Sequence, residues 1–318
     1  MKIIHLSEIE GFLVGHSVSE ESNTGCTAIL CPGGASASIH VPGFASSTRE
    51  TELLTPASYV TKIYGLSLSG GGAFGLSVAN GVERFLAERD TGFKSVYVTI
   101  PTVTGATLFD YPVNASAGKL PNEQMGYEAA ASAVSGPLKS GPYGVGRALR
   151  SGRLMAHSLH SVSGLGSYGV ALDSGLRLAA LAAVNSLGSI INPRNGEIVS
   201  GVRHADGTLL NRFEMLHALS LLPWDSPASE LGPTNTVVVA VATNATLDKV
   251  DAYRLARMAA AGISMATYPA HLLYDGDVVF AMSSCTEKSW NISFLGALAA
   301  EVVAGAILRS VPEYNDLP

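Results

Sequence analysis

The sequence predicts a mixed protein of the α/β or α+β class with one large core. Of its 318 residues, 47% are apolar and only 14% are charged, whereas about 25% are charged in an average globular domain. Residues 236–243, TVVVAVAT, are apolar and mostly β-branched, which is typical of a strand buried on both faces. Segments whose apolar residues recur with helical spacing lie between such strands, so both kinds of element are expected.

The N-terminal half contains three predicted strands and two predicted helices. The strands are expected over residues 27–31, 63–69 and 96–100, and the helices over residues 73–89 and 124–134. A run of three glycines ends the second strand, and Pro101 ends the third. The first helix carries apolar residues three and four positions apart, and the second is rich in alanine.

In the C-terminal half, three predicted strands alternate with two predicted helices and one long irregular segment, called the excursion below. The strands are expected over residues 176–185, 236–243 and 277–283, the excursion over residues 192–235, and the helices over residues 248–261 and 294–309. The excursion is rich in proline and charge, and long loops of this kind are usually functional or mobile. Residues 292–308 are the most apolar segment, but they are too short for a membrane span and contain Glu301, so a buried or interface helix is favoured.

Composition excludes several classes of function. A net charge of −6 without any basic run argues against nucleic-acid binding. The three cysteines are odd in number and form no Cys-x-x-Cys pair, which argues against a disulfide framework and a zinc site and favours a reducing, cytoplasmic location. Charged residues interrupt the first apolar stretch, unlike a secretory signal. The high apolar fraction suggests that subunit surfaces are buried too, so a homo-oligomer is expected. We expect it to be a tetramer or larger, and we expect no membrane partner.

Three motifs have ordinary structural explanations. The loop GGGAFG at residues 70–75 lacks the Lys-Ser/Thr of a phosphate-binding P-loop, so tight packing is favoured over ligand binding. His157 and His160 have no acidic residue between them, which excludes the helical motif of a metalloprotease and favours structural histidines. No Gly-x-Ser-x-Gly elbow occurs, which excludes a conventional serine hydrolase.

The junction between Asn235 and Thr236 suggests an unusual nucleophile. A threonine that opens a buried strand after a long loop becomes an N-terminal nucleophile if the bond before it is cut. The Thr236 hydroxyl would attack the Asn235 carbonyl, an ester would form, and water would release the Thr236 amine. An α-amino group has a pKa of about 7.7–8.0, so the freed amine of Thr236 is able to act as the base for the hydroxyl of the same residue. Many strands also begin with threonine for structural reasons alone.

Asp275 and Asp277 flank a glycine directly before the strand predicted at residues 277–283. Two explanations stay open for this pair. The carboxylates either cap a turn, or they orient a nucleophile or an amine by hydrogen bonding. No further metal-ligating residues occur near them in a recognisable pattern, so neither a metal nor a cofactor is expected.

Several blocks of sequence follow one another as in a known family. They read TGCTAILCP at residues 24–32, STRETELL at 47–54, LSGGGAFGL at 68–76, LFD at 108–110, MGY at 125–127, GLGS at 164–167, AVN at 183–185, VATNA at 241–245, DGD at 275–277 and VFA at 279–281. Each block alone is weak, but their common order extends over residues 10–284. The chain thereby resembles the P1 peptidase family, the DmpA-type aminopeptidases.

The resemblance implies a fold, a cleavage site and a set of roles. The fold would be a four-layer αββα sandwich, similar to that of ornithine acetyltransferase, in a single domain over residues 1–318. Self-cleavage would leave an α fragment, residues 1–235, and a β fragment, residues 236–318, with Thr236 as nucleophile. Asn185 would line the oxyanion hole, Asp275 and Asp277 would polarise the nucleophile and its amine, and Tyr143 is a possible oxyanion or substrate residue.

The implied activity is hydrolysis of N-terminal aminoacyl bonds, or of similar small amides and esters, through an acyl-enzyme. Two alternatives stay open. One is an acyltransferase of the ornithine-acetyltransferase type, although the ATM-type cleavage context of that family is absent. The other is an unprocessed protein that binds a ligand without catalysis, because residues 140–147 and 162–167 differ from the family pattern and lack its lysine before Gly164.

Overall fold

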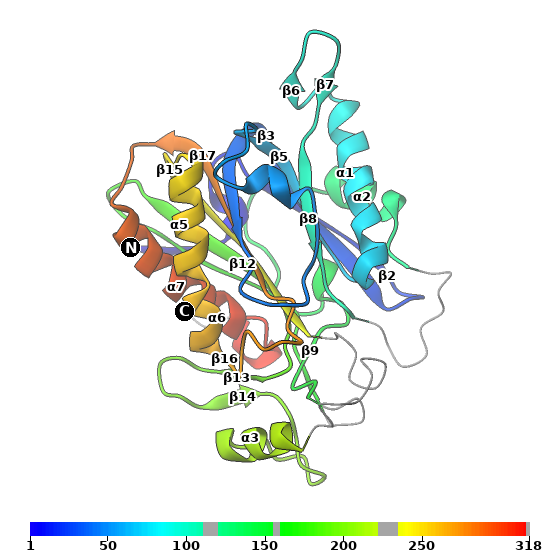
Figure 1. Cartoon of the computed structure of the whole chain (residues 1–318), viewed down its shortest axis with the longest axis vertical. Coiled ribbons are helices and arrows are strands. Elements are labelled where there is room, and N and C mark those ends of the chain that lie inside the picture. The colour runs from blue at the N-terminus through cyan, green and yellow to red at the C-terminus, as the bar shows by residue number, and fades with distance from the viewer. Residues whose placement is uncertain (111–119, 155–159, 222–234, 316–318) are drawn as a thin grey trace.

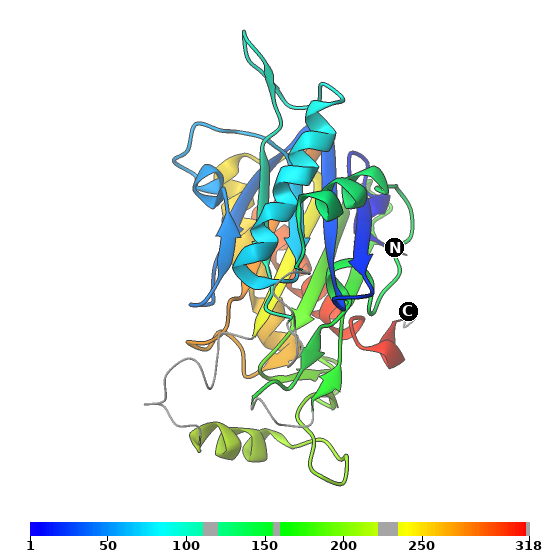
Figure 2. The same cartoon turned by 90° about the vertical axis from the view of Figure 1, so that its right-hand side faces the viewer.

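Two β-sheets lie face to face at the centre of the molecule, and helices cover the outer face of each (Figures 1 and 2). The computed structural model describes residues 1–110, 120–154, 160–221 and 235–315. The predicted His157 therefore lies outside the described residues.

The first sheet contains the candidate nucleophile. Its strands are, in spatial order, β1 (Lys2–Ile4), β11 (Leu165–Ala171), β12 (Arg177–Asn185), β15 (Thr236–Ala245), β17 (Val278–Glu287) and the C-terminal part of β3 (Thr24–His40). β15 runs antiparallel to β12 and parallel to β17. The register places Asn185, the last residue of β12, directly opposite Thr236, the first residue of β15.

The second sheet is built around the N-terminal part of β3. This part pairs with β2 (Leu13–Ser19) and β5 (Ile63–Ser69), and β5 leads on to β8 (Val103–Thr107) and β4 (Ser47–Arg49). β3 thus belongs to both sheets. Its pairing with β5 shifts between Leu30 and Ala35, where Gly34 has a φ of +74° that a glycine adopts without strain.

The apolar residues of β15 alternate between two cores. Val238, Ala240 and Ala242 pack between the two sheets. Their neighbours on the opposite face pack against α5 (Lys249–Ala259), α6 (Ala261–Ala266) and α7 (Ile292–Leu308). A third core lies between the second sheet and the helices α1 (Val78–Ala87) and α2 (Glu123–Ala131). The expected four-layer αββα sandwich is therefore confirmed.

Two predicted elements differ from the structure. The strand predicted at residues 96–100 is wrong: β6 (Phe93–Lys94) and β7 (Thr99–Ile100) form a short hairpin, in which Val96 is 91% exposed, and the buried strand β8 begins only after Pro101. The helix predicted from residue 73 begins with a 3₁₀ segment, η3 (Gly72–Ser77). Here Gly75 lies so close to the Gly70 carbonyl that a Cβ would approach it to 2.0 Å, and the α-helix starts after this contact.

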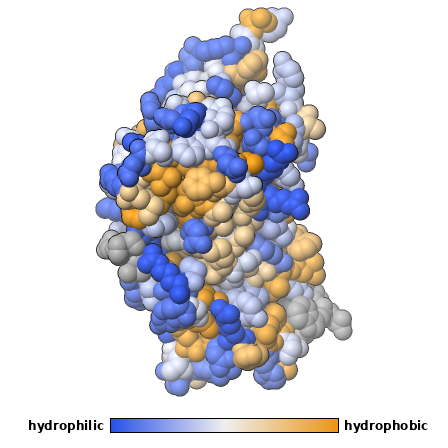
Figure 3. All heavy atoms as spheres, turned by 90° about the vertical axis from the view of Figure 1, so that its left-hand side faces the viewer, coloured by the Kyte–Doolittle hydropathy of each residue, from blue (hydrophilic) through white to orange (hydrophobic). Residues whose placement is uncertain are grey.

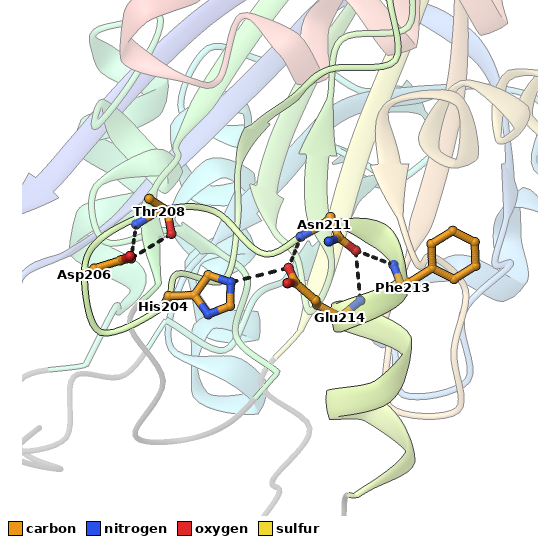
Figure 4. A network of polar contacts seen from close by, with 6 residues as sticks. All are labelled: His204, Asp206, Thr208, Asn211, Phe213 and Glu214. Atoms are coloured by element: carbon orange, nitrogen blue, oxygen red, sulfur yellow. Dashed lines mark hydrogen bonds and ion pairs between the residues drawn. The ribbon is translucent and has the colours of Figure 1, made fainter.

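The excursion at residues 192–235 is not a continuous loop. β14 (Ile198–Ser200) pairs with β13 (Ser189–Ile191), which pairs with β16 (Thr267–Tyr268). The helix α3 (Arg212–Ser220) follows, and Figure 4 shows the polar contacts at its start. The Asn211 side chain accepts the backbone N–H groups of Phe213 and Glu214 at 2.9 and 3.0 Å, while the Glu214 carboxylate accepts the Asn211 N–H at 2.7 Å. This reciprocal capping explains why a helix forms here.

The expected buried helix at residues 292–308 is confirmed as α7, most of whose residues are buried. Figure 3 shows the side of the molecule that carries α5 and α7, with apolar side chains spread over part of its surface. The homo-oligomer and the cytoplasmic location stay predictions. Among the described residues, no helix combines the length and hydropathy needed to cross a membrane.

The remaining elements are short. They are β9 (Arg150–Ser151), β10 (Ser161–Val162), η1 (Leu6–Glu8), η2 (Thr51–Leu54), η5 (Gly144–Gly146) and η6 (Pro312–Tyr314). β9 and β10 pair with each other in the segment that precedes β11.

Candidate active site

The bond between Asn235 and Thr236 lies at the start of β15 and is buried. Thr236 is only 5% exposed and Asn235 only 2%. The Thr236 hydroxyl donates to the Asn235 carbonyl oxygen at 2.6 Å, and the Gly276 backbone N–H donates to the same oxygen at 2.9 Å. The hydroxyl therefore lies beside the carbonyl that it would attack, and an N–H group already points at the oxygen that would become negative.

Gly276 allows this close approach because it has no side chain. A Cβ atom on Gly276 would lie 2.7 Å from the Thr236 hydroxyl oxygen and 2.8 Å from the Ala45 carbonyl oxygen. Both distances are shorter than van der Waals contact permits. In the sequence this glycine is only a spacer between two aspartates, and its contact with Thr236 is visible only in the structure.

Asp277 connects the start of β15 to a histidine. Its Oδ1 accepts the Val237 backbone N–H at 2.8 Å, and its Oδ2 accepts the Nδ1 of His271 at 2.8 Å and the His271 backbone N–H at 3.2 Å. Burial lowers the pKa of His271, but its hydrogen bond to Asp277 and the charges of Asp277 and Asp275 outweigh that effect and raise the pKa above its usual value. The sequence does not single out His271 as a site residue, because the eight histidines are scattered along the chain and no motif surrounds this one.

Asp275 stabilises the turn before β17. Its Oδ2 accepts the Leu272 N–H at 2.8 Å, and its backbone carbonyl accepts the N–H groups of Phe44 and Ala45 at 2.8 and 3.0 Å. Burial and the charge of Asp277 raise the pKa of Asp275 to about 7. Asp275 therefore supports a turn, as the first explanation requires, and Asp277 binds the N–H of Val237, the residue after Thr236. That the pair orients the nucleophile or its amine stays a prediction.

The raised pKa of Asp275 predicts a pH-dependent stability difference. The folded chain binds this proton more tightly than the unfolded chain, so the stability that it contributes is complete below the unfolded pKa of about 3.9 and is lost as the pH rises through about 7. Asparagine does not ionise and keeps an acceptor for Leu272. We therefore expect Asp275→Asn to gain stability relative to its parent as the pH increases from 5 to 8.

Urea unfolding of the uncut Thr236→Ala chain, with and without Asp275→Asn, measures this difference in unfolding free energy at each pH. The matched control is Asp173→Asn, because the Asp173 side chain is 97% exposed and its ion pair is expected to contribute little. Parallel pH curves for the Asp275 variant and its parent would contradict the prediction.

Asn185 lies on the other side of Thr236, on β12. Because the two residues are directly opposite in an antiparallel pair, their side chains emerge on the same face of the sheet. The Asn185 Oδ1 accepts the Arg150 backbone N–H at 3.1 Å and the Arg153 guanidinium at 3.3 Å, while its Nδ2 donates to the Phe109 carbonyl at 2.9 Å. These partners hold the fully buried amide in one orientation and join the first sheet to the segment after β8.

A buried carboxylate, Asp110, lies next to the Phe109 carbonyl in the sequence. It accepts the Thr24 hydroxyl at 2.6 Å and the Gly71 N–H at 2.7 Å. Burial raises the pKa of Asp110 despite these hydrogen bonds. A Cβ on Gly70 would come within 2.0 Å of an Asp110 carboxylate oxygen, which confirms that this glycine loop packs tightly.

Tyr143, the possible oxyanion or substrate residue, lies at the surface of the molecule. It precedes η5, is 41% exposed, and lines a surface pocket with Val14 and His16. The Lys139 ammonium nitrogen lies 5.4 Å from the centre of the Tyr143 ring. None of the described contacts of Tyr143 joins it to Thr236. Among the described residues, no three His, Cys, Asp or Glu side chains gather closely enough to hold a metal ion.

Comparison with known proteins finds relatives over nearly the whole chain. The model of peptidase family S58 matches residues 5–316. A protein of Mycobacterium tuberculosis named as an uncharacterized aminopeptidase is 30% identical over 347 residues, covering 98% of this chain and 97% of that protein. The 6-aminohexanoate-oligomer endohydrolase of a Kocuria species is 27% identical, covering 95% of this chain and 84% of that protein.

Two solved structures share the fold. The L-aminopeptidase D-Ala-esterase/amidase of Ochrobactrum anthropi, described as a variant of the Ntn-hydrolase fold, superimposes with a TM-score of 0.67 at 16% identity. A β-aminopeptidase of a Burkholderia species superimposes with a TM-score of 0.64 at 19% identity. Each match covers 95% of this chain and 84% of the other, so the sandwich as a whole has the architecture of these enzymes.

Proposed function

The chain belongs to peptidase family S58, and we propose that it is a self-processing aminopeptidase or amidase whose nucleophile is Thr236. One observation carries this proposal. The Thr236 hydroxyl and the Gly276 N–H both contact the carbonyl oxygen of the bond to be cut. A hydroxyl beside a carbonyl whose oxygen already receives an N–H is the ground-state arrangement that an N-to-O acyl shift requires.

Self-processing would begin on the uncut chain. The Thr236 oxygen attacks the Asn235 carbonyl carbon, and the Gly276 N–H stabilises the negative oxygen of the tetrahedral intermediate. The bond to the Thr236 nitrogen then breaks, the nitrogen takes up the proton that the hydroxyl has lost, and an ester between Asn235 and the Thr236 oxygen remains. Water hydrolyses the ester into the Asn235 carboxylate and a free Thr236 with its own amine and hydroxyl. The buried hydrogen bond from Val237 to Asp277 keeps the start of β15 in position throughout.

Turnover would reuse the same residue. The α-amine of Thr236 belongs to a class of groups whose ordinary pKa is about 7.7–8.0. It accepts the proton of the hydroxyl as the hydroxyl attacks the substrate, and then donates that proton to the leaving amine. Water hydrolyses the acyl-threonine ester and releases the acid. The Asn185 amide is on the same face as the hydroxyl, which suits it to stabilise the oxyanion.

The relatives support small amides as the substrate class. One relative is named as an aminopeptidase and another as an endohydrolase of 6-aminohexanoate oligomers. We therefore propose that short peptides or similar amides and esters are hydrolysed at the bond next to a free amine. No cofactor takes part in this chemistry.

The mass of the purified protein under denaturing conditions tests the proposal. We expect two species that correspond to residues 1–235 and 236–318. N-terminal sequencing of the smaller species should begin Thr-Val-Val. A single 318-residue chain that stays uncut over days would contradict the self-processing step.

A further inference from the structure

Two arginines accompany Asn185 at the candidate site. The Arg153 guanidinium donates to the Asn185 Oδ1 at 3.3 Å, and the Arg153 backbone N–H donates to the Ser186 carbonyl at 3.2 Å. The Arg150 backbone N–H donates to the same Asn185 oxygen at 3.1 Å, while its guanidinium donates to the Leu149 carbonyl at 2.9 Å. Both side chains are partly buried. The Arg150 backbone and the Arg153 side chain are thus both bonded to the residue that lies directly opposite Thr236 in the β12–β15 pair.

Neither arginine forms an ion pair with a carboxylate among the residues that the structure describes. Asp110 is near enough to act on the charge of Arg153, but its carboxylate is bound to Thr24 and Gly71. Burial lowers the pKa of both guanidinium groups, and the charge of Arg150 lowers that of Arg153 further. Both guanidinium groups are partly removed from water, and they are close enough for the charge of one to act on the other. Binding of an anion near them would offset both effects.

The order of strands places the arginines and the pair of aspartates on different sides of Thr236. β15 lies between β12 and β17, so the arginines approach Thr236 from the β12 side and the Asp275–Asp277 pair from the β17 side. Adjacent strands are only about 4.8 Å apart. A short molecule bound beside Thr236 would therefore have the arginines on its β12 side and the two aspartates on its β17 side.

We propose that Arg150 and Arg153 bind a carboxylate of the substrate, so that the preferred substrates are short peptides or amides with a negative charge close to the bond that is hydrolysed. A guanidinium presents its N–H donors in a planar fork that matches a carboxylate. This inference rests on the proposed function, because it names the substrate class of the same site.

Matched pairs of substrates test the inference with the unmodified enzyme. L-alanyl-L-alanine and L-alanyl-L-alanine amide differ only in a carboxylate on the leaving group. L-aspartic acid α-p-nitroanilide and L-asparagine α-p-nitroanilide differ only in a carboxylate on the acyl part. We expect kcat/KM to be at least about 10-fold higher for the carboxylate member of one pair, since hydrogen bonds to charged groups are strong. A difference within the dipeptide pair would place the bound carboxylate on the leaving group, and a difference within the nitroanilide pair would place it on the acyl part.

Two variants connect the preference to the arginines. Arg150→Gln removes one charge but keeps the backbone N–H that holds Asn185, and Arg153→Lys keeps the charge but loses the fork. Each should lower the ratio of kcat/KM between the carboxylate member and the neutral member of the pair. Arg153→Lys also changes a contact of Asn185, so its rates on both members are expected to fall, and the ratio between them is the quantity compared. The matched control is Arg147→Gln, because Arg147 in the same segment contacts Glu20 and Asn23 instead; it should keep the preference.

The outcomes separate this inference from the proposed function. Equal rates for both members of both pairs would overturn the inference and leave the hydrolase proposal intact. If no probe is hydrolysed, the hydrolase proposal fails for these substrates, and calorimetric titration of the unmodified protein with the same dipeptide and nitroanilide pairs decides the inference. Tighter binding of a carboxylate member, lost in Arg150→Gln, would support it; equal binding or no binding would overturn it.

Discussion

Replacement of Thr236 by alanine is expected to leave the chain uncut and without hydrolytic activity. The hydroxyl is the attacking group in both self-processing and turnover, and an uncut chain also lacks the free amine that serves as base. Loss of a catalytic nucleophile reduces kcat by several powers of ten, on the order of 10⁴-fold or more. Intact mass and a peptide-hydrolysis assay measure the two effects on one preparation. Thr236→Ser keeps a hydroxyl and should still cut.

The control for this variant lies on the same strand. Thr243 is also fully buried in β15, but its hydroxyl donates to the Arg177 carbonyl at the opposite end of the strand. Thr243→Ala should cost about 1 kcal/mol of unfolding free energy and leave the cleavage at residue 235 intact. If Thr236→Ala were still cut between residues 235 and 236, a different nucleophile would be required. If neither the parent nor the variant is cut while both bind the same ligand, the chain would be a binding protein.

Gly276→Ala should block self-processing even though no reacting group is removed. Its Cβ would fall 2.7 Å from the Thr236 hydroxyl oxygen, so either the hydroxyl or the Gly276 N–H has to move away from the Asn235 carbonyl. A displacement of about 1 Å at a reacting centre can cost on the order of 100-fold in rate. Overpacking should also lower the unfolding free energy by about 1–3 kcal/mol. The cut fraction, followed by mass over time, measures the rate.

Gly33→Ala is the matched control for Gly276→Ala. Its added Cβ meets no atom within 4 Å, so the same change of residue should leave cleavage at the parent rate. Circular dichroism and a thermal melt show whether Gly276→Ala is folded at the assay temperature. A folded Gly276→Ala chain that is cut as fast as the parent would show that the contact with Thr236 is unnecessary.

The regular elements could be predicted from the sequence because their signals are local. Residues 63–69 form β5 as expected, and the strand predicted at residues 236–243 extends by only two residues. Alternate residues of that strand fill separate cores, which accounts for its apolar sequence on both faces. The strand predicted at residues 96–100 failed because an apolar run alone does not show whether another layer covers it.

The candidate site could be predicted only in part. Asn235, Thr236, Asn185 and the two aspartates were found from strand boundaries and family blocks, and the structure brings all five together through β12, β15 and the turn before β17. Their catalytic roles stay predictions. Tyr143 was placed on a loosely matched loop, and the described contacts do not join it to this group.

The amino-acid sequence by itself determined most of the long buried strands and helices and the residue that opens β15, and the family blocks within it implied the four layers. Only the tertiary structure decided which groups surround that residue. His271 is bonded to Asp277, which binds the residue after Thr236. Arg153 is bonded to Asn185, which lies opposite Thr236. Gly276 is 40 positions further along the chain than Thr236, yet it packs against the Thr236 hydroxyl. Hydrophobic periodicity is set by near neighbours in the chain, whereas these polar contacts depend on how separate strands pair and on which loops their ends support. A side chain's position in the sequence does not carry that information.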